Sequence, residues 1–464
     1  HPMSDGRSPT LIRRPSLHGR SRRTDSERST TEQTPPRLLT CYIRLWAAST
    51  LLRVYTATGR GDPISIPIQL LIIAVLLAAL FPARPALTCT ALGLRGAIFF
   101  AVGGPLSNSQ NWAMHVDTTL LLALLPYMSS SKLTSADESQ IFSIAGPITR
   151  LQLVIFYLAS GVWKLNTSFM DHRYSCASIY LVSLIGHRVT ANATILTILA
   201  ALAPAATIAG EMVLPLLQAA PNPGRWSRLG VAATLLFHLL IGITPPPHNI
   251  AIYGVTTTAR LYFWLPQSAA NACNELVATS WLLPCMLAIA ASVVAYVRTE
   301  SGHGNPGLVG GLNVDWCCGF VACVCVLFAR AMRIEATREQ VPGGDDGGRS
   351  TWRHASRVAP WTSYSMTILA VSYAFLLPIL GLQERGGCLM FSQLRLHAGS
   401  NHALFPTALL QRWMVNGDPA SALSGGVVRV ERFATVGVVD WVGQGFEEIL
   451  PPSTNALLRD AGVP

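Results

Sequence analysis

The chain has 464 residues, of which 50% are hydrophobic and only 12% are charged. Soluble globular domains carry about 25% charged residues, so charge this sparse leaves too little polar surface and argues against a soluble protein. The net charge of +10 does not indicate a nucleic-acid partner, because the basic residues lie in the N-terminal tail and between apolar runs rather than along one face. The composition predicts an integral membrane protein that contacts lipids and no nucleic acid.

The first 36 residues differ from the rest of the chain. Residues 1–36 are rich in Arg, Ser, Thr and Pro and have no apolar periodicity. This composition predicts a disordered basic tail. It has no apolar core of the kind that a secretory signal requires. Its Arg and Ser bias is typical of a transit peptide, whereas its four acidic residues argue against one.

Apolar runs follow one another through residues 37–300 and predict a transmembrane bundle. Ile66–Leu80 has one polar side chain and Ala193–Gly210 has no charge, and each fits the roughly 20 residues that cross a bilayer as a helix. The expected spans lie near 38–57, 64–83, 86–104, 115–129, 141–164, 189–218, 228–244, 248–266 and 275–297, with two more near 307–330 and 362–382. We predict an all-α polytopic membrane bundle of about 9–11 transmembrane helices.

Charge and β-branched residues indicate the organisation of the C-terminal half. Residues 301–382 are expected to form two further helices joined by a polar, Arg-rich loop at 331–360. This loop and the N-terminal tail then face the cytoplasm-like side, which places residues 383–464 on the opposite side. Val427–Val430 and Thr435–Val439 are typical of short strands. We therefore expect a small, weakly β extramembranous domain at the C-terminus.

Cysteines and glycosylation sequons add little chemistry. Four of the ten cysteines lie close together, namely Cys317, Cys318, Cys323 and Cys325. Their spacing on one helix does not converge on a metal ion, so we expect small buried hydrophobic residues and no metal. A disulfide between Cys176 and Cys388 remains open. The sequons at Asn166 and Asn192 both lie close to expected spans, which disfavours their use.

Ionisable residues inside apolar runs are the informative ones, because a charge in a membrane is costly unless it serves a purpose. Lys164 ends the run IFYLASGVWK. It either extends to the lipid headgroups or points into the bundle, where desolvation favours its neutral, basic form. His115 opens the run MHVDTTLLLALL, where it is either an interfacial residue or a proton carrier, a hydrogen-bond donor or a ligand of a pigment or metal. Asp117 equally fits the first turn of a helix.

Two other buried candidates lie farther along the chain. Glu211 lies in ATIAGEMVLPLL and His238 in TLLFHLLIG, both enclosed by apolar residues. Glu211 needs either a partner or a proton in such a setting. Arg260, in TTTARLYFWLP, is a candidate partner for Glu211.

Four segments in order resemble the vitamin K-dependent γ-carboxylase and the wider horizontally transferred transmembrane domain (HTTM) family. Tyr157–Phe169 (YLASGVWKLNTSF) is similar to the family's Y-x-x-A-G-x-x-K-L-D-x-x-W segment, with Lys164 at its lysine. Asn111–Leu122 resembles the segment of W-N-N-H type, with His115 at its histidine. Glu211–Leu216 resembles an apolar helix led by Glu. Leu236–Pro266 resembles the family's F-H and F-P pattern, with His238 at its histidine. The resemblance covers roughly residues 85–270.

The resemblance implies an enzyme of lyase type in an endomembrane like that of the endoplasmic reticulum. In the family the lysine acts as base on a reduced quinone, whose reaction with oxygen yields a stronger base that removes a glutamate γ-proton, so that carbon dioxide adds. Lys164 and His115 are then the catalytic candidates. The substrate-binding candidates are Tyr157, Glu211, His238 and Arg260, and the cofactor is a reduced, vitamin K-like quinone.

Departures from the family pattern support an alternative. Asn166 stands where the family has an acid, and Phe169 where it has Trp. Residues 383–464 are too few for the family's large lumenal domain, and the segment Phe391–Pro406 has no assigned role. The alternative is a non-catalytic subunit of a larger respiratory or photosynthetic complex in a mitochondrial or plastid membrane. Such a subunit would bind lipid, quinone or pigment.

Overall fold

The structure is a computed structural model, and the fold is described here for the residues whose placement it defines. These are residues 38–58, 64–102, 108–172, 175–189, 193–220, 225–244, 251–278, 288, 314–339, 360–379, 388 and 402–404. They all belong to the unit that spans Pro36–Pro464. The predicted tail at 1–36 and the predicted strands Val427–Val430 and Thr435–Val439 lie outside the described residues, as does Asn192.

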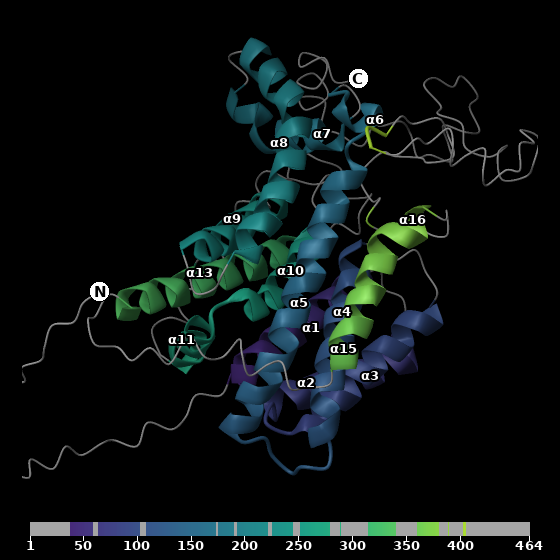
Figure 1. Cartoon of the computed structure of the whole chain (residues 1–464), viewed down its shortest axis with the longest axis vertical. Helices are drawn as coiled ribbons and strands as arrows, with labels where there is room; N and C mark the ends of the chain where they lie inside the picture. Colours follow the sequence, from purple (N-terminus) through teal and green to yellow (C-terminus); the bar gives the residue numbers. More distant parts are fainter. Residues whose placement is uncertain are drawn as a thin grey trace, which may run out of the picture. The chain divides into compact units, whose positions relative to one another are not determined.

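The described part of the chain is mostly helical (Figure 1). The main helices are α1 (Leu38–Thr58), α2 (Ile66–Leu80), α3 (Pro85–Val102), α4 (Asn108–Leu124), α5 (Ser135–Trp163), α6 (Thr167–Met170), α7 (Cys176–Val189), α8 (Ala193–Ala219), α9 (Arg225–Gly242), α10 (Ala251–Arg260), α11 (Gln267–Ala278), α13 (Val314–Glu339), α15 (Pro360–Val371) and α16 (Leu377–Ile379). Within these ranges, the β structure is one isolated bridge between Asn166 and His402. The prediction of a helical bundle is confirmed.

Within the described part of the chain, four helical segments are long and apolar enough to cross a membrane. They are Ser135–Trp163, Thr194–Ala219, Trp316–Thr337 and Thr362–Ile379, and their most apolar windows have mean hydropathies of 1.4 to 1.9. The shorter helices α2 and α3 are also apolar. Large apolar side chains of α2 point outward, among them Ile66 and Leu80, as expected of a surface that faces lipid. The structure therefore agrees with an integral membrane protein, and the larger number of 9–11 spanning helices stays a prediction.

Helix α5 is the element around which the bundle is organised. It begins with a capping box, in which Thr134 accepts from the backbone N–H of Asp137 and Asp137 accepts from that of Thr134. It packs against α4, α8 and α15, and Figure 1 shows α4 and α15 beside it. Gly161 permits the approach of α8, because a Cβ atom there would lie 2.8 Å from Cγ of Met212. The C-terminal end of α5 is therefore held close to the middle of α8.

The structure corrects one expectation from the sequence, adds one helix and decides one alternative that the sequence left open. The polar loop predicted at 331–360 does not begin at 331, because α13 continues to Glu339. The helix continues beyond 331 because Ala331, Met332 and Glu335 face the interior. There the carboxylate of Glu335 forms an ion pair with Arg228 at 2.9 Å. The helix α7, ahead of the span predicted at 189–218, was not foreseen. The disulfide left open between Cys176 and Cys388 is not formed.

Candidate functional site

The most prominent buried pair joins Lys164 to Glu211. Lys164 is the residue that ends α5, and Glu211 lies within α8, where α5 and α8 approach each other at Gly161. The ammonium Nζ of Lys164 donates to Oε1 of Glu211 at 2.8 Å and to Oε2 at 2.6 Å. Lys164 is 5% exposed and Glu211 7%. Lys164 therefore points into the bundle and not towards the headgroups, and Glu211 has the partner that its burial requires.

A second polar contact lies on the same helix as Lys164. The Tyr157 hydroxyl forms a short hydrogen bond with Nε2 of His238, and both side chains are buried. The other ring nitrogen of His238, Nδ1, is buried without a partner. The ring of Tyr253 lies 5.1 Å from that of His238, centroid to centroid. Since Tyr157 and Lys164 are seven residues apart, they share one face of α5. The structure therefore places two of the predicted residues, Tyr157 and Lys164, along one helix face and gives each a buried partner.

Asn166 holds the chain in place just after Lys164. Its side-chain oxygen accepts from the backbone N–H of Phe169 at 2.9 Å and caps the short helix α6, while its amide donates to the carbonyl of Trp163. This residue is 2% exposed, so glycosylation at its sequon conflicts with the fold.

A short C-terminal segment, 402–404, reaches back to the end of α5. Nε2 of His402 lies 2.7 Å from the carbonyl of Val162, and Nδ1 accepts from the backbone of Leu404. The backbone N–H of Ala403 donates to the carbonyl of Leu165 at 2.8 Å. Burial lowers the pKa of His402 below its ordinary value, and the Val162 carbonyl acts in the opposite direction. The neutral imidazole is therefore the form that fits here.

His115 lies in a small cavity of its own between α4, α5 and α15. The space open to a water-sized molecule there is about 10 Å³, which is about the minimum for one water. Three polar atoms of its lining are buried without a partner: Nε1 of Trp112, Nδ1 of His115 and Oε1 of Gln152. Aromatic rings complete the wall, and Tyr373 lies 5.2 Å from His115, centroid to centroid. The cavity therefore offers one donor, one acceptor and one imidazole nitrogen to a small polar group.

The wall formed by Tyr373 and Ala374 has unusual backbone geometry. Residues Ser372–Leu376 form a π-helical turn between α15 and α16, a feature frequent at functional sites. The carbonyl of Ala374 accepts from Nε1 of Trp163 at 2.8 Å. Because Trp163 immediately precedes Lys164, this hydrogen bond connects the His115 cavity to the end of α5.

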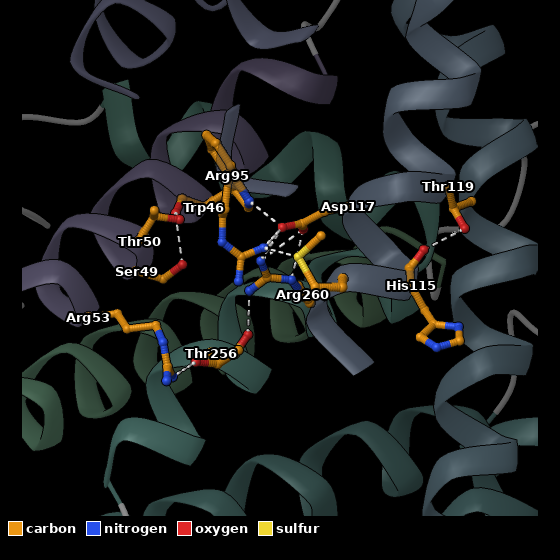
Figure 2. A network of polar contacts seen from close by, with 11 residues as sticks. Trp46, Ser49, Thr50, Arg53, Arg95, His115, Asp117, Thr119, Thr256 and Arg260 are labelled. Atoms are coloured by element: carbon orange, nitrogen blue, oxygen red, sulfur yellow. Dashed lines mark hydrogen bonds and ion pairs between the residues drawn. The ribbon is translucent and has the colours of Figure 1, made fainter. Parts of the chain in front are cut away.

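A third polar group surrounds Asp117 and is called here the Asp117 cluster, comprising Trp46, Arg95, Asp117 and Arg260 (Figure 2). Arg260 reaches the carboxylate through Nε at 3.0 Å and Nη2 at 2.8 Å. Trp46 donates at 3.2 Å, and Arg95 forms an ion pair with the same carboxylate. The expected pairing of Arg260 with Glu211 is therefore wrong. Asp117 lies inside α4, far from its first turn.

Sequence reasoning found some of these residues and missed others. Lys164, Glu211, Tyr157 and His238 are gathered at the contacts of α5 with α8 and α9, whereas His115 and Arg260 belong to two other places. Arg95 was missed, although it lies in the apolar run TCTALGLRGAIFF and an arginine in such a run is itself a signal.

Comparison with known proteins gives one match. Residues 400–464 match a family described as a domain of unknown function, DUF8388. No curated protein and no solved structure matches the chain. The match covers a minor part of the chain, of which 402–404 are described, so it leaves the bundle without an assigned family.

Proposed function

We propose that this chain is a carboxylase-like integral membrane protein that binds or acts on a lipid-soluble substrate of quinone type. The observation that carries the proposal is the buried pair of Lys164 and Glu211 at the end of α5. Buried charges within membrane helices are costly and rare, so a pair of this kind is a functional candidate by default. Its position at the lysine of the resembled motif adds support.

The pair can move a proton. With Nζ within 2.8 Å of both carboxylate oxygens, a proton passes from the ammonium of Lys164 to Glu211 without a rearrangement of either side chain. The neutral amine then takes the hydroxyl proton of a reduced quinone, so that the O–H bond breaks, an N–H bond forms and a quinolate remains.

Tyr157, His238 and the His115 cavity have supporting roles in the proposal. The Tyr157–His238 hydrogen bond positions two polar groups on the face of α5 that carries Lys164. The unpartnered atoms around His115 suit one small polar group of about the size of water. The cofactor in this proposal is the reduced quinone itself.

One observation favours the alternative, a non-catalytic subunit that keeps the fold of an enzyme. Both oxygens of Glu211 are already engaged by Lys164 in a closed pair. Such a pair also serves to join α5 to α8 without chemistry. In that case the exposed apolar side chains of α2 would pack against a neighbouring subunit instead of lipid.

The test is native purification of the full chain in mild detergent, followed by mass spectrometry of the extracted lipophilic molecules and of co-purifying proteins. The proposal predicts a quinone at near one equivalent with the wild type, and no turnover of a reduced naphthoquinone by Lys164→Ala. The matched control is Lys132→Ala, at an exposed lysine outside the bundle, which should behave as wild type. Stoichiometric recovery inside a large complex, without quinone and without turnover, would establish the alternative.

A further inference from the structure

The Asp117 cluster contains more positive than negative charge. Two arginines, Arg95 and Arg260, share the single carboxylate of Asp117, and the three side chains are 10%, 1% and 2% exposed. A guanidinium does not lose its proton in proteins, so the cluster cannot become neutral by deprotonation. One buried positive charge is therefore left without a counter-charge inside the cluster, which is unfavourable in a medium of low dielectric constant.

The carboxylate oxygens of Asp117 make only one contact with Arg95, because their other contacts are with Arg260 and Trp46. Its oxygens accept from Nε and Nη2 of Arg260 and from Nε1 of Trp46, and Oδ2 also forms an ion pair with Nη1 of Arg95. Arg260 is also completed on its other side, where Nη1 donates to the backbone carbonyl of Thr256 at 2.7 Å. Arg260 is thus fully engaged, and the excess charge resides at Arg95.

The two arginines differ in how their Nε and Nη2 donors, which form one edge of the guanidinium, are used. The edge formed by Nε and Nη2 binds both oxygens of a carboxylate in the bidentate manner. In Arg260 this edge holds Asp117. In Arg95 the contacts are made by Nη1, to Asp117 and to the sulfur of Met114 at 3.7 Å. Among the residues that the structure describes, none accepts from Nε or Nη2 of Arg95.

We infer that the Nε and Nη2 edge of Arg95 binds a small planar oxyanion of the carboxylate or bicarbonate class. Such an ion supplies the missing negative charge and repeats at Arg95 the contact that Asp117 makes with Arg260. Arg53 adds attraction: it lies near the cluster and donates to Oγ1 of Thr256 at 3.4 Å (Figure 2). The Arg95 side chain is 10% exposed, whereas that of Arg260 is 1% exposed.

The site is separate from the one in the proposed function. It lies on α1, α3, α4 and α10, whereas the Lys164 pair lies on α5 and α8. Its test is therefore independent of any quinone.

The experiment measures thermal unfolding of the purified full chain in detergent, with sodium chloride replaced stepwise by sodium formate at constant ionic strength. Formate has the two-oxygen edge of a carboxylate and chloride does not. The expected result is a saturable rise in the wild-type Tm of about 2 °C or more. Binding is read directly as broadening of the ¹³C-formate NMR line by the protein.

Variants at Arg95 decide the outcome. Arg95→Gln should abolish both the shift and the line broadening, and Arg95→Lys, which keeps the charge but lacks the two-donor edge, should reduce both. Arg84→Gln removes an exposed arginine just before α3 and should leave both unchanged. The inference would be overturned if formate raised the Tm of wild type and of Arg95→Lys equally. It would also be overturned if chloride raised the wild-type Tm as much as formate does.

Discussion

The Lys164 pair and the Asp117 cluster both bury charge in one helical bundle, yet they balance it differently. Lys164 meets one carboxylate, that of Glu211, and both of its oxygens are used. Asp117 meets two guanidiniums. The difference teaches that a lysine can share or lose its proton within a balanced pair, which suits proton transfer. Arginines keep theirs, which suits a fixed positive site for an anion.

The largest expected effect comes from removing the only carboxylate of the Asp117 cluster. Asp117→Asn leaves two guanidiniums facing each other, so we expect the free energy of unfolding to fall by about 3–5 kcal/mol. It is measured by titration with SDS in mixed micelles. Asp137→Asn, at the exposed start of α5, is the control and should cost about 1 kcal/mol. A loss for Asp117→Asn no larger than that of the control would show that the cluster does not bury real charge.

The second prediction concerns the Lys164 pair. Lys164→Met leaves Glu211 without a partner, and we expect a loss of about 2–3 kcal/mol, below the first value because both side chains keep some exposure. In the double variant Lys164→Met with Glu211→Leu, most of the loss should be recovered, since apolar packing replaces the pair. Lys132→Met is the matched control. If the double variant were as unstable as the single one, the two residues would not act as a pair.

These predictions rest on contacts that the sequence could only partly reveal. Buried ionisable residues such as Lys164, Glu211 and His238 were found because a charge in an apolar run is unusual. Their partners were not all predicted correctly. The sequence does not show whether Glu211 contacts Lys164 or Arg260. The partner was decided by the approach of α5 and α8 at Gly161, which is a tertiary fact.

The helices show the same limit. The apolar runs predict most of the helices. They place the end of α13 too early, because the polar residues from 331 onward are typical of a loop. That helix continues because the buried Glu335 has a partner in the half-buried Arg228, 107 residues away. The π-helical turn at Ser372–Leu376 has no sequence signal that we recognise.

A third prediction concerns the hydrogen bond that joins the end of α5, next to Lys164, to the wall of the His115 cavity. Trp163→Phe removes the hydrogen bond to the Ala374 carbonyl next to the His115 cavity, which should cost about 1 kcal/mol. The loss should appear as faster hydrogen exchange in α15 and α16. Trp226→Phe, at a tryptophan that is 51% exposed, should leave that exchange unchanged. Unaltered exchange in Trp163→Phe would show that this bond does not hold the wall.

The smallest effect is a dependence on pH at His402. Its pKa is lowered in the folded chain, so its contribution to stability is complete above the unfolded value of about 6.5 and is lost as pH falls from there towards the lowered pKa. Between pH 7.5 and pH 5 we expect segment 402–404 to become more accessible to limited proteolysis. In His402→Gln, which does not titrate, accessibility should not change over this range. A response that persists in His402→Gln would assign it to another group.

The central claim is that the Lys164 pair transfers protons for a lipid-soluble substrate. The most direct test is oxygen uptake by the protein in lipid nanodiscs after addition of a reduced naphthoquinone, compared between wild type, Lys164→Ala and the control Lys132→Ala. The account predicts uptake by wild type and control that falls at least about tenfold in Lys164→Ala while quinone binding persists. Equal uptake in all three proteins, or none in the wild type with quinone bound, would contradict it.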